Sequence, residues 1–312
     1  MNALLFPGQG SQSVGMGKEF YNNFDTVKKL FHQADEKLNF SISKLILDGP
    51  EEKLQLTENT QPAILVVSYS IFKVLKEEFN IHPNFFKYFA GHSLGEYSAL
   101  VSSGSLSFSD ALYLLNERGK AMQEAVPVGE GSMLAVLGLK IDEIKYLIEN
   151  LEHKKVCEIA NDNANGQVII SGDKNSVENF KILLKEKNIK SIPLKVSAPF
   201  HCSLMKPAGD KMKEKINEIS FKKPINNVIN NVTAGIEKDP ITIKKLLIDQ
   251  IFSTVKWRES LIYMSKKGIT NFIEIGPGKA LTGMVKRTVK DVNCFSINSI
   301  DDIKKYQNEL QK

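Results

Sequence analysis

Short apolar runs alternate with amphipathic runs over both ends of this chain, and the alternation constrains the fold more than any other feature of its 312 residues. Apolar runs of this length predict strands, and the amphipathic runs between them predict helices. The strands expected outside the middle of the chain are residues 2–6, the run that ends at Gly91, and residues 226–230, 271–276 and 293–297. Strands that alternate with helices favour a mostly parallel sheet covered on both faces.

The rhythm changes between about residues 132 and 194, where the expected order is strand, helix, strand, strand, helix, strand. The order β-α-β-β-α-β is typical of a ferredoxin-like unit. We therefore expect a small ferredoxin-like subdomain, residues 126–195, inserted into a large α/β subdomain made of residues 1–125 and 196–312.

Two helices of the large subdomain have clear predicted starts. Pro62 predicts a helix that begins after Gln61, because proline is favoured in the first turn. A second helix is expected from about Ser109 to Ala125, behind the capping sequence SFSD.

Composition argues against several classes of protein. No apolar run is long enough to span a bilayer, and the first ten residues lack the basic start of a signal peptide. Cys157, Cys202 and Cys294 are odd in number and far apart, which argues against a disulfide framework or a zinc site and favours the cytoplasm. The net charge of +5 comes from lysines interleaved with acids, so neither nucleic acid nor a membrane is expected as a partner.

The turn Gly91-His92-Ser93-Leu94-Gly95 carries the strongest local signal. It fits Gly-x-Ser-x-Gly between a predicted strand and a predicted helix, which is the context of a nucleophile elbow. Glycine permits the sharp turn, and the start of the next helix offers free N–H groups. Ser93 is therefore the candidate nucleophile, and the main-chain N–H of Leu94 is a candidate oxyanion donor.

A serine hydroxyl is a weak nucleophile and needs a general base. Three of the five histidines lie in polar or charged segments typical of a surface. His92 is adjacent to Ser93, and neighbours on a sharp turn point apart, which favours a structural role for it. His201 stands between Pro199 and Pro207, where the chain re-enters the large subdomain, and is the favoured base.

A glycine-rich loop after the first strand supplies a candidate for the second oxyanion donor. In hydrolases with a nucleophile elbow this donor comes from a loop that follows an early strand. The loop here is Pro7-Gly8-Gln9-Gly10, and the N–H of Gln9 is our candidate. The same residues are equally compatible with a simple tight turn.

Arginine is scarce, because only Arg118, Arg258 and Arg287 occur among 41 basic residues. An arginine that persists is expected where lysine fails, as in bidentate recognition of a carboxylate or phosphate. Chance codon usage is one alternative. For Arg118, a surface ion pair with Glu117 or Glu124 is another.

Five separated motifs resemble those of the malonyl-CoA:acyl carrier protein transacylase family, whose freestanding bacterial members serve type II fatty acid synthesis. In chain order they are FPGQGSQ, AGHSLGEYSAL, NDNANGQVIISG, HCSLMKPA and EIGPGKALTGM. The match runs from Phe6 to about Met284. The resemblance implies an α/β-hydrolase-like core with a ferredoxin-like insertion, in agreement with the order of predicted elements.

The resemblance also implies roles for single residues. Ser93 is the acylated nucleophile, and His201 is first its base and then the acid that protonates the leaving thiol. The main-chain N–H groups of Gln9 and Leu94 form the oxyanion hole. Arg118 holds the free carboxylate of the acyl group, which a bidentate guanidinium fits.

Four further positions follow from the same resemblance. The main-chain carbonyl of Gln250 orients the catalytic histidine, with the neighbouring Asp249 as its competitor for that role. Phe200 matches a bulky position that could exclude a branched methylmalonyl group. Asn161 and Gln61 match polar positions of the family, and the sequence assigns no role to either.

The implied reaction passes a malonyl group from malonyl-CoA to Ser93 and then to the phosphopantetheine thiol of acyl carrier protein, without a metal or a bound cofactor. Acyl carrier protein is typically acidic, so a transient electrostatic contact with the lysines of residues 185–195 is expected, and the enzyme is expected to be a monomer. A serine hydrolase and a non-catalytic scaffold are the competing hypotheses. Arg118 argues against the first, and the intact pair of Ser93 and His201 argues against the second.

Overall fold

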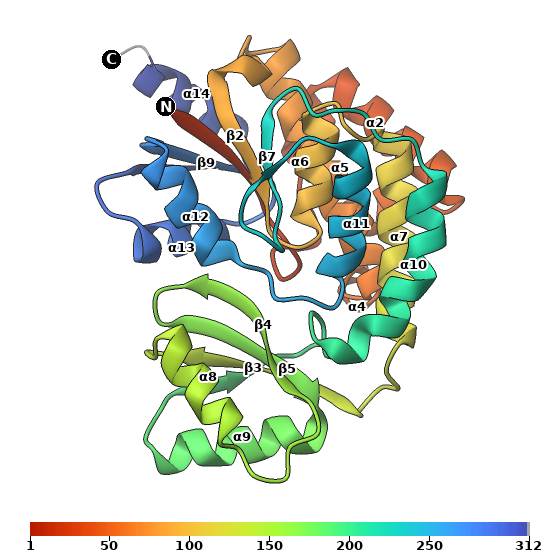
Figure 1. The fold of residues 1–312 in the computed structure, drawn as a ribbon. Helices are drawn as coiled ribbons and strands as arrows, with labels where there is room; N and C mark the ends of the chain where they lie inside the picture. The colour runs from red at the N-terminus through yellow and green to blue at the C-terminus, as the bar shows by residue number, and fades with distance from the viewer. Residues whose placement is uncertain (311–312) are drawn as a thin grey trace.

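The computed structural model describes residues 1–310 and contains two sheets, one above the other in Figure 1. The strands of the larger sheet, in spatial order, are β10 (Asn293–Ile297), β9 (Asn271–Ile275), β1 (Asn2–Phe6), β2 (Phe86–Gly91), β7 (Asn227–Ile229) and β8 (Ile236–Glu237). All neighbours pair in parallel except β7 and the short edge strand β8. The predicted α/β class with a mostly parallel sheet is confirmed.

Both faces of the larger sheet are buried, as the alternation along β1 illustrates. Leu4 and Phe6 belong to one apolar cluster, whereas Ala3 and Leu5 belong to another on the opposite face. Successive side chains of a strand point to opposite faces, so each face needs its own layer of helices. The sheet is therefore the middle of three layers.

The larger layer of helices supplies most of the main core. It comprises α1 (Lys18–Asn23), α2 (Asp25–Leu38), α3 (Ile42–Asp48), α4 (Glu51–Leu54), α5 (Thr57–Glu77), α6 (Gly95–Ser102), α7 (Phe108–Glu124), α10 (Lys206–Glu218), α11 (Pro240–Gln250) and α14 (Ile300–Leu310). The opposite layer comprises α12 (Trp257–Lys266) and α13 (Ala280–Thr288). Two 3₁₀ turns, η1 (Pro83–Phe85) and η2 (Ser203–Met205), precede β2 and α10.

The smaller sheet has the order β4 (Cys157–Ala164), β5 (Gln167–Asp173), β3 (Gly131–Leu137) and β6 (Ser191–Pro193), and every neighbouring pair is antiparallel. Helices α8 (Ile141–Glu149) and α9 (Lys174–Glu186) complete the order β-α-β-β-α-β. The ferredoxin-like insertion predicted from that order is confirmed.

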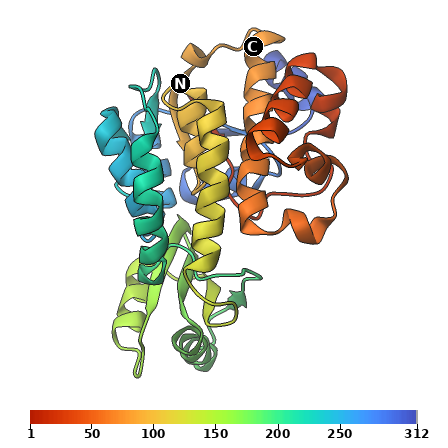
Figure 2. The same cartoon turned by 90° about the vertical axis from the view of Figure 1, so that its right-hand side faces the viewer.

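The smaller sheet uses its two faces differently. Leu134 and Val136 on β3 pack with α8 and α9, whereas Met133 and Ala135 belong to the main core of the molecule. Figures 1 and 2 show α7 and α10 running down one side of the molecule toward this sheet. The termini lie at the opposite end. The insertion therefore shares the main core through one face of β3, and its strand β4 also packs against α12 and α13.

The start of α5 differs from the prediction, since the helix begins at Thr57 and contains Pro62 in its interior. Proline lacks the N–H that would bond to the carbonyl of Glu58, four residues earlier. The side-chain amide of Asn116 on α7 donates to that carbonyl instead, at 3.0 Å. A tertiary contact therefore compensates for the bond that Pro62 removes. The strand β8 and the helices α1 to α4, α12 and α14 were not predicted individually.

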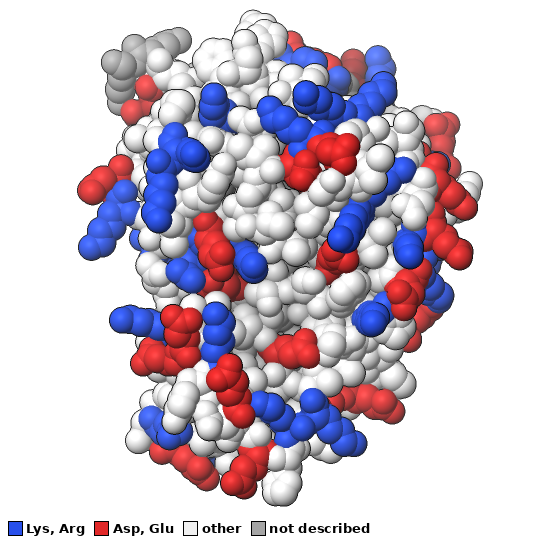
Figure 3. Space-filling view, in the orientation of Figure 1, with Lys and Arg blue, Asp and Glu red and all other residues white. Residues whose placement is uncertain are grey.

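Charges of both signs are mixed on the surface. Figure 3 shows Lys and Arg side chains interleaved with Asp and Glu over the face drawn. Within residues 1–310, no helix combines the length and the apolar character that a bilayer crossing requires.

Candidate active site

A sharp turn between β2 and α6 carries Ser93. The residue has a φ of 51°, in the left-handed region that is uncommon for residues other than glycine. A Cβ atom on Gly91 would lie 1.9 Å from the carbonyl carbon of Gly95, and one on Gly95 would lie 2.3 Å from the carbonyl oxygen of Phe6. Glycine is therefore required on both sides of the serine, as in a nucleophile elbow.

His201 reaches Ser93 from the segment between β6 and η2. Its Nε2 lies 2.7 Å from Ser93 Oγ, and its Nδ1 lies 2.8 Å from the main-chain carbonyl oxygen of Gln250. His201 also has a positive φ, 58°, so the candidate nucleophile and the candidate base both occupy a strained backbone conformation. The carboxylate of Asp249 is not the partner of Nδ1, and the Gln250 carbonyl takes that place.

The carbonyl of Gln250 determines how the imidazole is protonated. A carbonyl oxygen can only accept, so Nδ1 carries the hydrogen and Nε2 is left to accept from the Ser93 hydroxyl. Burial, and to a smaller extent the positive charge of Arg118, lower the pKa of His201 to about 3. The ring is therefore neutral near pH 7 and able to take a proton.

Arg118 on α7 is only 1% exposed and points at the nucleophile. Its guanidinium nitrogens donate to Gln61 Oε1 at 2.6 Å, to Gln250 Oε1 at 2.8 Å and to Ser93 Oγ at 3.2 Å. Its Nε is buried without a partner in residues 1–310. Since every partner is neutral, the charge remains available to a bound carboxylate.

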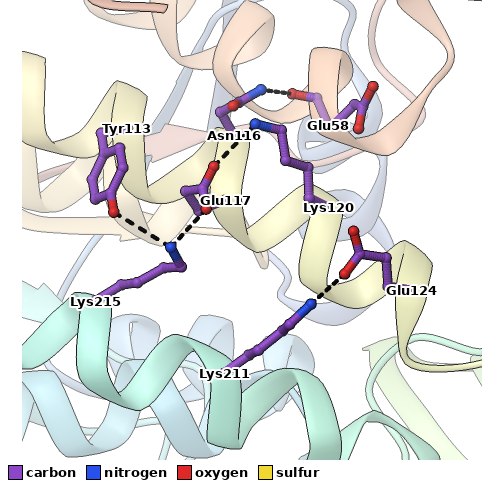
Figure 4. A network of polar contacts seen from close by, with 8 residues as sticks. All are labelled: Glu58, Tyr113, Asn116, Glu117, Lys120, Glu124, Lys211 and Lys215. Atoms are coloured by element: carbon purple, nitrogen blue, oxygen red, sulfur yellow. Dashed lines mark hydrogen bonds and ion pairs between the residues drawn. The ribbon is translucent and has the colours of Figure 1, made fainter.

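The two acids that were the alternative partners of this arginine are paired elsewhere. Glu117 contacts Lys120 at 3.0 Å and Lys215 of α10 at 2.8 Å. Glu124 pairs with Lys211, also of α10. Figure 4 shows Lys211 and Lys215 reaching from α10 to Glu124 and Glu117 on α7. The surface ion pair proposed as an alternative for the arginine is therefore absent from the described residues.

The loop after β1 packs onto the elbow. A Cβ atom on Gly8 would lie 2.6 Å from the carbonyl oxygen of His92, so the two turns are in contact. Within residues 1–310, the main-chain N–H groups of Gln9 and Leu94 donate to no other protein group. Two free donors on adjoining loops are what an oxyanion site requires.

Two residues of the site escaped the sequence analysis. Glu96 is 2% exposed, and its Oε2 accepts from the Gln250 side-chain amide at 2.7 Å and from the Asn231 N–H at 3.0 Å. Asn231 Oδ1 in turn accepts from the Ser93 N–H at 2.7 Å. Two features of the sequence could have indicated these residues. Glu96 is a single acid in the apolar first turns of α6, and Asn231 belongs to a pair of asparagines directly after β7.

The remaining predicted positions lie outside this hydrogen-bonded cluster. Phe200 is buried in the main core, and Asn161 on β4 pairs as an isolated bridge with Val255. His92 turns away from Ser93 and its Nε2 lies 2.7 Å from Asn163 Oδ1 on β4, in agreement with a structural role. No group of three or more His, Cys, Asp or Glu residues within the described chain is arranged to hold a metal ion.

Comparison with known proteins places this geometry in a family. The acyl transferase domain family matches residues 3–311. A malonyl CoA-acyl carrier protein transacylase of Bacillus subtilis is 45% identical over 303 residues, covering 96% of this chain and 94% of the relative. The protein of the same name from Escherichia coli K12 is 40% identical and covers 95% of each chain.

Solved structures agree with the sequence relatives. An acyl-carrier-protein S-malonyltransferase from Bartonella henselae superimposes with a TM-score of 0.96 at 39% identity, over 100% of this chain and 99% of that one. A malonyl-transacylase solved in complex with its type II PKS acyl-carrier protein has a TM-score of 0.95 at 38% identity, over 99% of both chains. This chain therefore belongs to the acyl transferase domain family and, within it, to the malonyl CoA-acyl carrier protein transacylases.

Proposed function

We propose that this enzyme transfers a malonyl group from malonyl-CoA to the phosphopantetheine thiol of acyl carrier protein, through a malonyl ester on Ser93. One observation carries the proposal. A general base and a buried guanidinium converge on the same hydroxyl, with His201 Nε2 at 2.7 Å and Arg118 at 3.2 Å from Ser93 Oγ. A base activates the serine, and the guanidinium selects an acyl group with a free carboxylate.

The first half-reaction acylates the enzyme. His201 Nε2 takes the proton as Ser93 Oγ attacks the thioester carbon, and the Gln250 carbonyl steadies the imidazolium through Nδ1–H. The N–H groups of Gln9 and Leu94 bind the oxyanion, each contributing about 3 kcal/mol. The tetrahedral intermediate collapses, the C–S bond breaks, and the coenzyme A thiolate takes the proton from the imidazolium.

The second half-reaction runs the same steps toward the acceptor. His201 takes the proton of the phosphopantetheine thiol, and the sulfur attacks the malonyl ester. The C–O bond to Ser93 breaks, and the serine oxygen recovers its proton from His201. All groups used in this scheme come from the protein, and we propose that neither a metal nor a bound cofactor takes part.

Arg118 orients the acyl group in both halves. The malonyl carboxylate binds the guanidinium in place of its contact with Ser93 Oγ, which frees the hydroxyl for attack. Gln61 holds the far side of the guanidinium at 2.6 Å, and we propose this as its role. Phe200, in our proposal, limits the space for a branched acyl group, and we assign no role to Asn161.

Intact-protein mass spectrometry tests the proposal directly. After incubation with malonyl-CoA the chain should gain one malonyl group, located at Ser93, and should lose it when acyl carrier protein is added. Ser93→Ala should show no gain. Equal labelling of Ser93→Ala would refute the covalent mechanism, and loss of the malonyl group to water at the same rate without carrier protein would identify a hydrolase.

The rate at which the enzyme binds the acidic carrier protein should depend on salt concentration. The exposed lysines at 185, 187, 190 and 195 lie at the end of α9 and on either side of β6, and we propose this stretch as the docking surface. We expect kcat/KM for acyl carrier protein to fall as salt rises and with Lys187→Glu, because exposed charges are screened. Transfer to free pantetheine, which is uncharged, is the control and should change little. If kcat/KM for acyl carrier protein changes neither with salt nor with Lys187→Glu, the carrier protein docks on another surface.

A further inference from the structure

The positive charge of Arg118 is balanced by an acid that it does not contact directly. Within residues 1–310, no carboxylate lies within ion-pair distance of the guanidinium, whose partners are all neutral. The nearest acid in the network is Glu96, which reaches Arg118 through the side-chain amide of Gln250. The amide donates from Nε2 to Glu96 at 2.7 Å and accepts at Oε1 from Arg118 at 2.8 Å.

This amide has only one favourable orientation. Turning it over would bring its NH₂ group against the guanidinium and its oxygen against the carboxylate. Gln250 Nε2 also donates to the carbonyl oxygen of Ser93 at 3.1 Å. Glu96 thus determines the orientation of the side chain whose main-chain carbonyl holds His201, and it leaves the guanidinium free for the substrate.

A bound acyl carboxylate changes the charge of this buried cluster. Without substrate, one cation and one anion lie on either side of an amide and neutralise each other. A carboxylate on Arg118 would leave the cluster with a net negative charge, which is unfavourable in a buried site. Protonation of Glu96 from solvent restores neutrality without breaking the hydrogen bonds that Gln250 and Asn231 donate, because a carboxylic acid keeps an acceptor oxygen.

We propose that Glu96 is a positioning residue for carboxylate recognition, and that it takes up one proton from solvent when the acyl carboxylate binds Arg118. The inference rests on the proposed role of Arg118 and adds a dependence on pH to it. It predicts that recognition of malonyl, but not of acetyl, is coupled to protonation of a residue that never touches the substrate.

The titratable groups around Glu96 make neutral pH the informative range. Burial raises the pKa of Glu96 to about 7, against the hydrogen bonds of Asn231 and Gln250 and the charge of Arg118. The pKa of His201 is lowered to about 3, and that of Tyr97, the neighbour of Glu96 on α6, is raised to about 12. Among these groups, Glu96 is therefore the one that titrates between pH 6 and 9.

The test is the ratio of kcat/KM for malonyl-CoA to that for acetyl-CoA, because effects on His201 and on the thioester are common to both substrates. The protonated form of Glu96 favours the carboxylate, so the ratio is highest below pH 7 and falls as the pH rises. We expect a fall of roughly three- to thirtyfold between about pH 6.5 and 8.5. Glu96→Gln should keep a high ratio that is independent of pH.

Glu274→Gln is the matched control. Glu274 is also a buried acid whose pKa is raised by burial, but it caps the start of α13 and lies outside the Arg118 network. This variant should retain the pH dependence of the unaltered enzyme. A ratio that is flat with pH in the unaltered enzyme, or an unchanged slope in Glu96→Gln, would overturn the inference.

A calorimetric measurement keeps the inference testable even where Glu96→Gln folds poorly. Binding of malonyl-CoA to Ser93→Ala at pH 8, in two buffers of different ionisation enthalpy, should reveal uptake of up to one proton. Acetyl-CoA should reveal none, and zero uptake with malonyl-CoA would contradict the coupling. Failure of the proposed function looks different, because Ser93 would then not be acylated and Arg118→Ala would leave the ratio unchanged at every pH.

Discussion

At the scale of single residues, two of the three arginines occupy positions where lysine would be insufficient. Arg118 donates to three acceptors in the buried site. Arg258 binds both carboxylate oxygens of Asp162, and Arg287 donates to Gln167. Arg118 and Arg258 use the fixed fork of the guanidinium, which a single ammonium cannot reproduce, whereas Arg287 makes one exposed hydrogen bond.

Arg118→Ala should remove most of the preference for malonyl. Loss of one partner of a buried ion pair costs about 3–5 kcal/mol, so the malonyl-to-acetyl ratio of kcat/KM should fall by roughly two to three decades. For Arg118→Lys the ratio should lie between that of the unaltered enzyme and that of Arg118→Ala, because lysine keeps the charge but not the forked geometry of the guanidinium. Glu117→Gln, which changes partly exposed ion pairs of the same helix away from Ser93, serves as the control and should leave the ratio unaltered.

His201 should make folding stability depend on pH. The unfolded imidazole protonates near pH 6.5, whereas burial and Arg118 lower the pKa of the folded one to about 3. The unfolded state therefore binds more protons between these values, and stability falls as the pH falls through that window. At pH 5 the loss relative to pH 7 is about 2 kcal/mol. Urea unfolding should show that the free energy of unfolding of His201→Asn falls by correspondingly less between pH 7 and pH 5. An identical fall in the variant and the unaltered enzyme would argue against a buried neutral ring.

At the scale of elements, α5 and α7 are joined by a bond that neither helix could form alone. Pro62 leaves the Glu58 carbonyl without its helical donor, and Asn116 supplies one from the next helix. Both helices carry site residues, Gln61 and Arg118, and those residues are in contact at 2.6 Å. The substitute bond therefore helps to align Gln61 with Arg118, the two residues of the proposed carboxylate site.

A double-mutant cycle measures this substitute bond. Asn116→Ala should cost about 1–3 kcal/mol, because it leaves a carbonyl without a partner. In a Pro62→Ala background the cost should be smaller by about 1 kcal/mol, since residue 62 can then donate to Glu58 as in an ordinary helix. Equal costs in the two backgrounds, measured by urea unfolding, would show that Asn116 acts in another way.

At the scale of the whole molecule, polar contacts on the β4–β5 side of the inserted sheet join it to the helices α12 and α13 of the large subdomain. Asp162 on β4 is 1% exposed and binds Arg258 of α12 with three contacts of 2.9–3.0 Å. The Asn165 side chain donates to the carbonyl of Arg287 at the end of α13. We propose that the unit so attached comprises residues 126–195, with residues 1–125 and 196–312 forming the rest.

Arg258→Ala should lower the folding stability of the whole chain, because it leaves Asp162 buried and unpaired. The expected cost is about 3–5 kcal/mol in the free energy of unfolding. Lys18→Ala, which removes one partner of the exposed pair with Asp48, is the comparison and should lower the free energy of unfolding by no more than about 1 kcal/mol. Similar costs for the two variants would mean that the Asp162 pair contributes no more than a surface pair.

Much of the fold and part of the site could be predicted from local patterns. The strands and helices follow from the period of their apolar residues, and the elbow follows from two glycines around Ser93. The start of α5 was wrong because a proline normally marks a first turn, and its donor Asn116 is distant in sequence. Glu96 was missed because a single acid on a helix gives no sign of burial.

The sequence by itself determined the order of the elements, the elbow and the family, because these depend on short-range periodicity, turn chemistry and motifs. Only the tertiary structure decided that the Gln250 carbonyl and not Asp249 meets His201, and that Glu96 meets Arg118 through an amide. Those contacts join residues far apart in the chain, and their strength comes from burial. Burial and the orientation of an amide are products of packing, which no local pattern records.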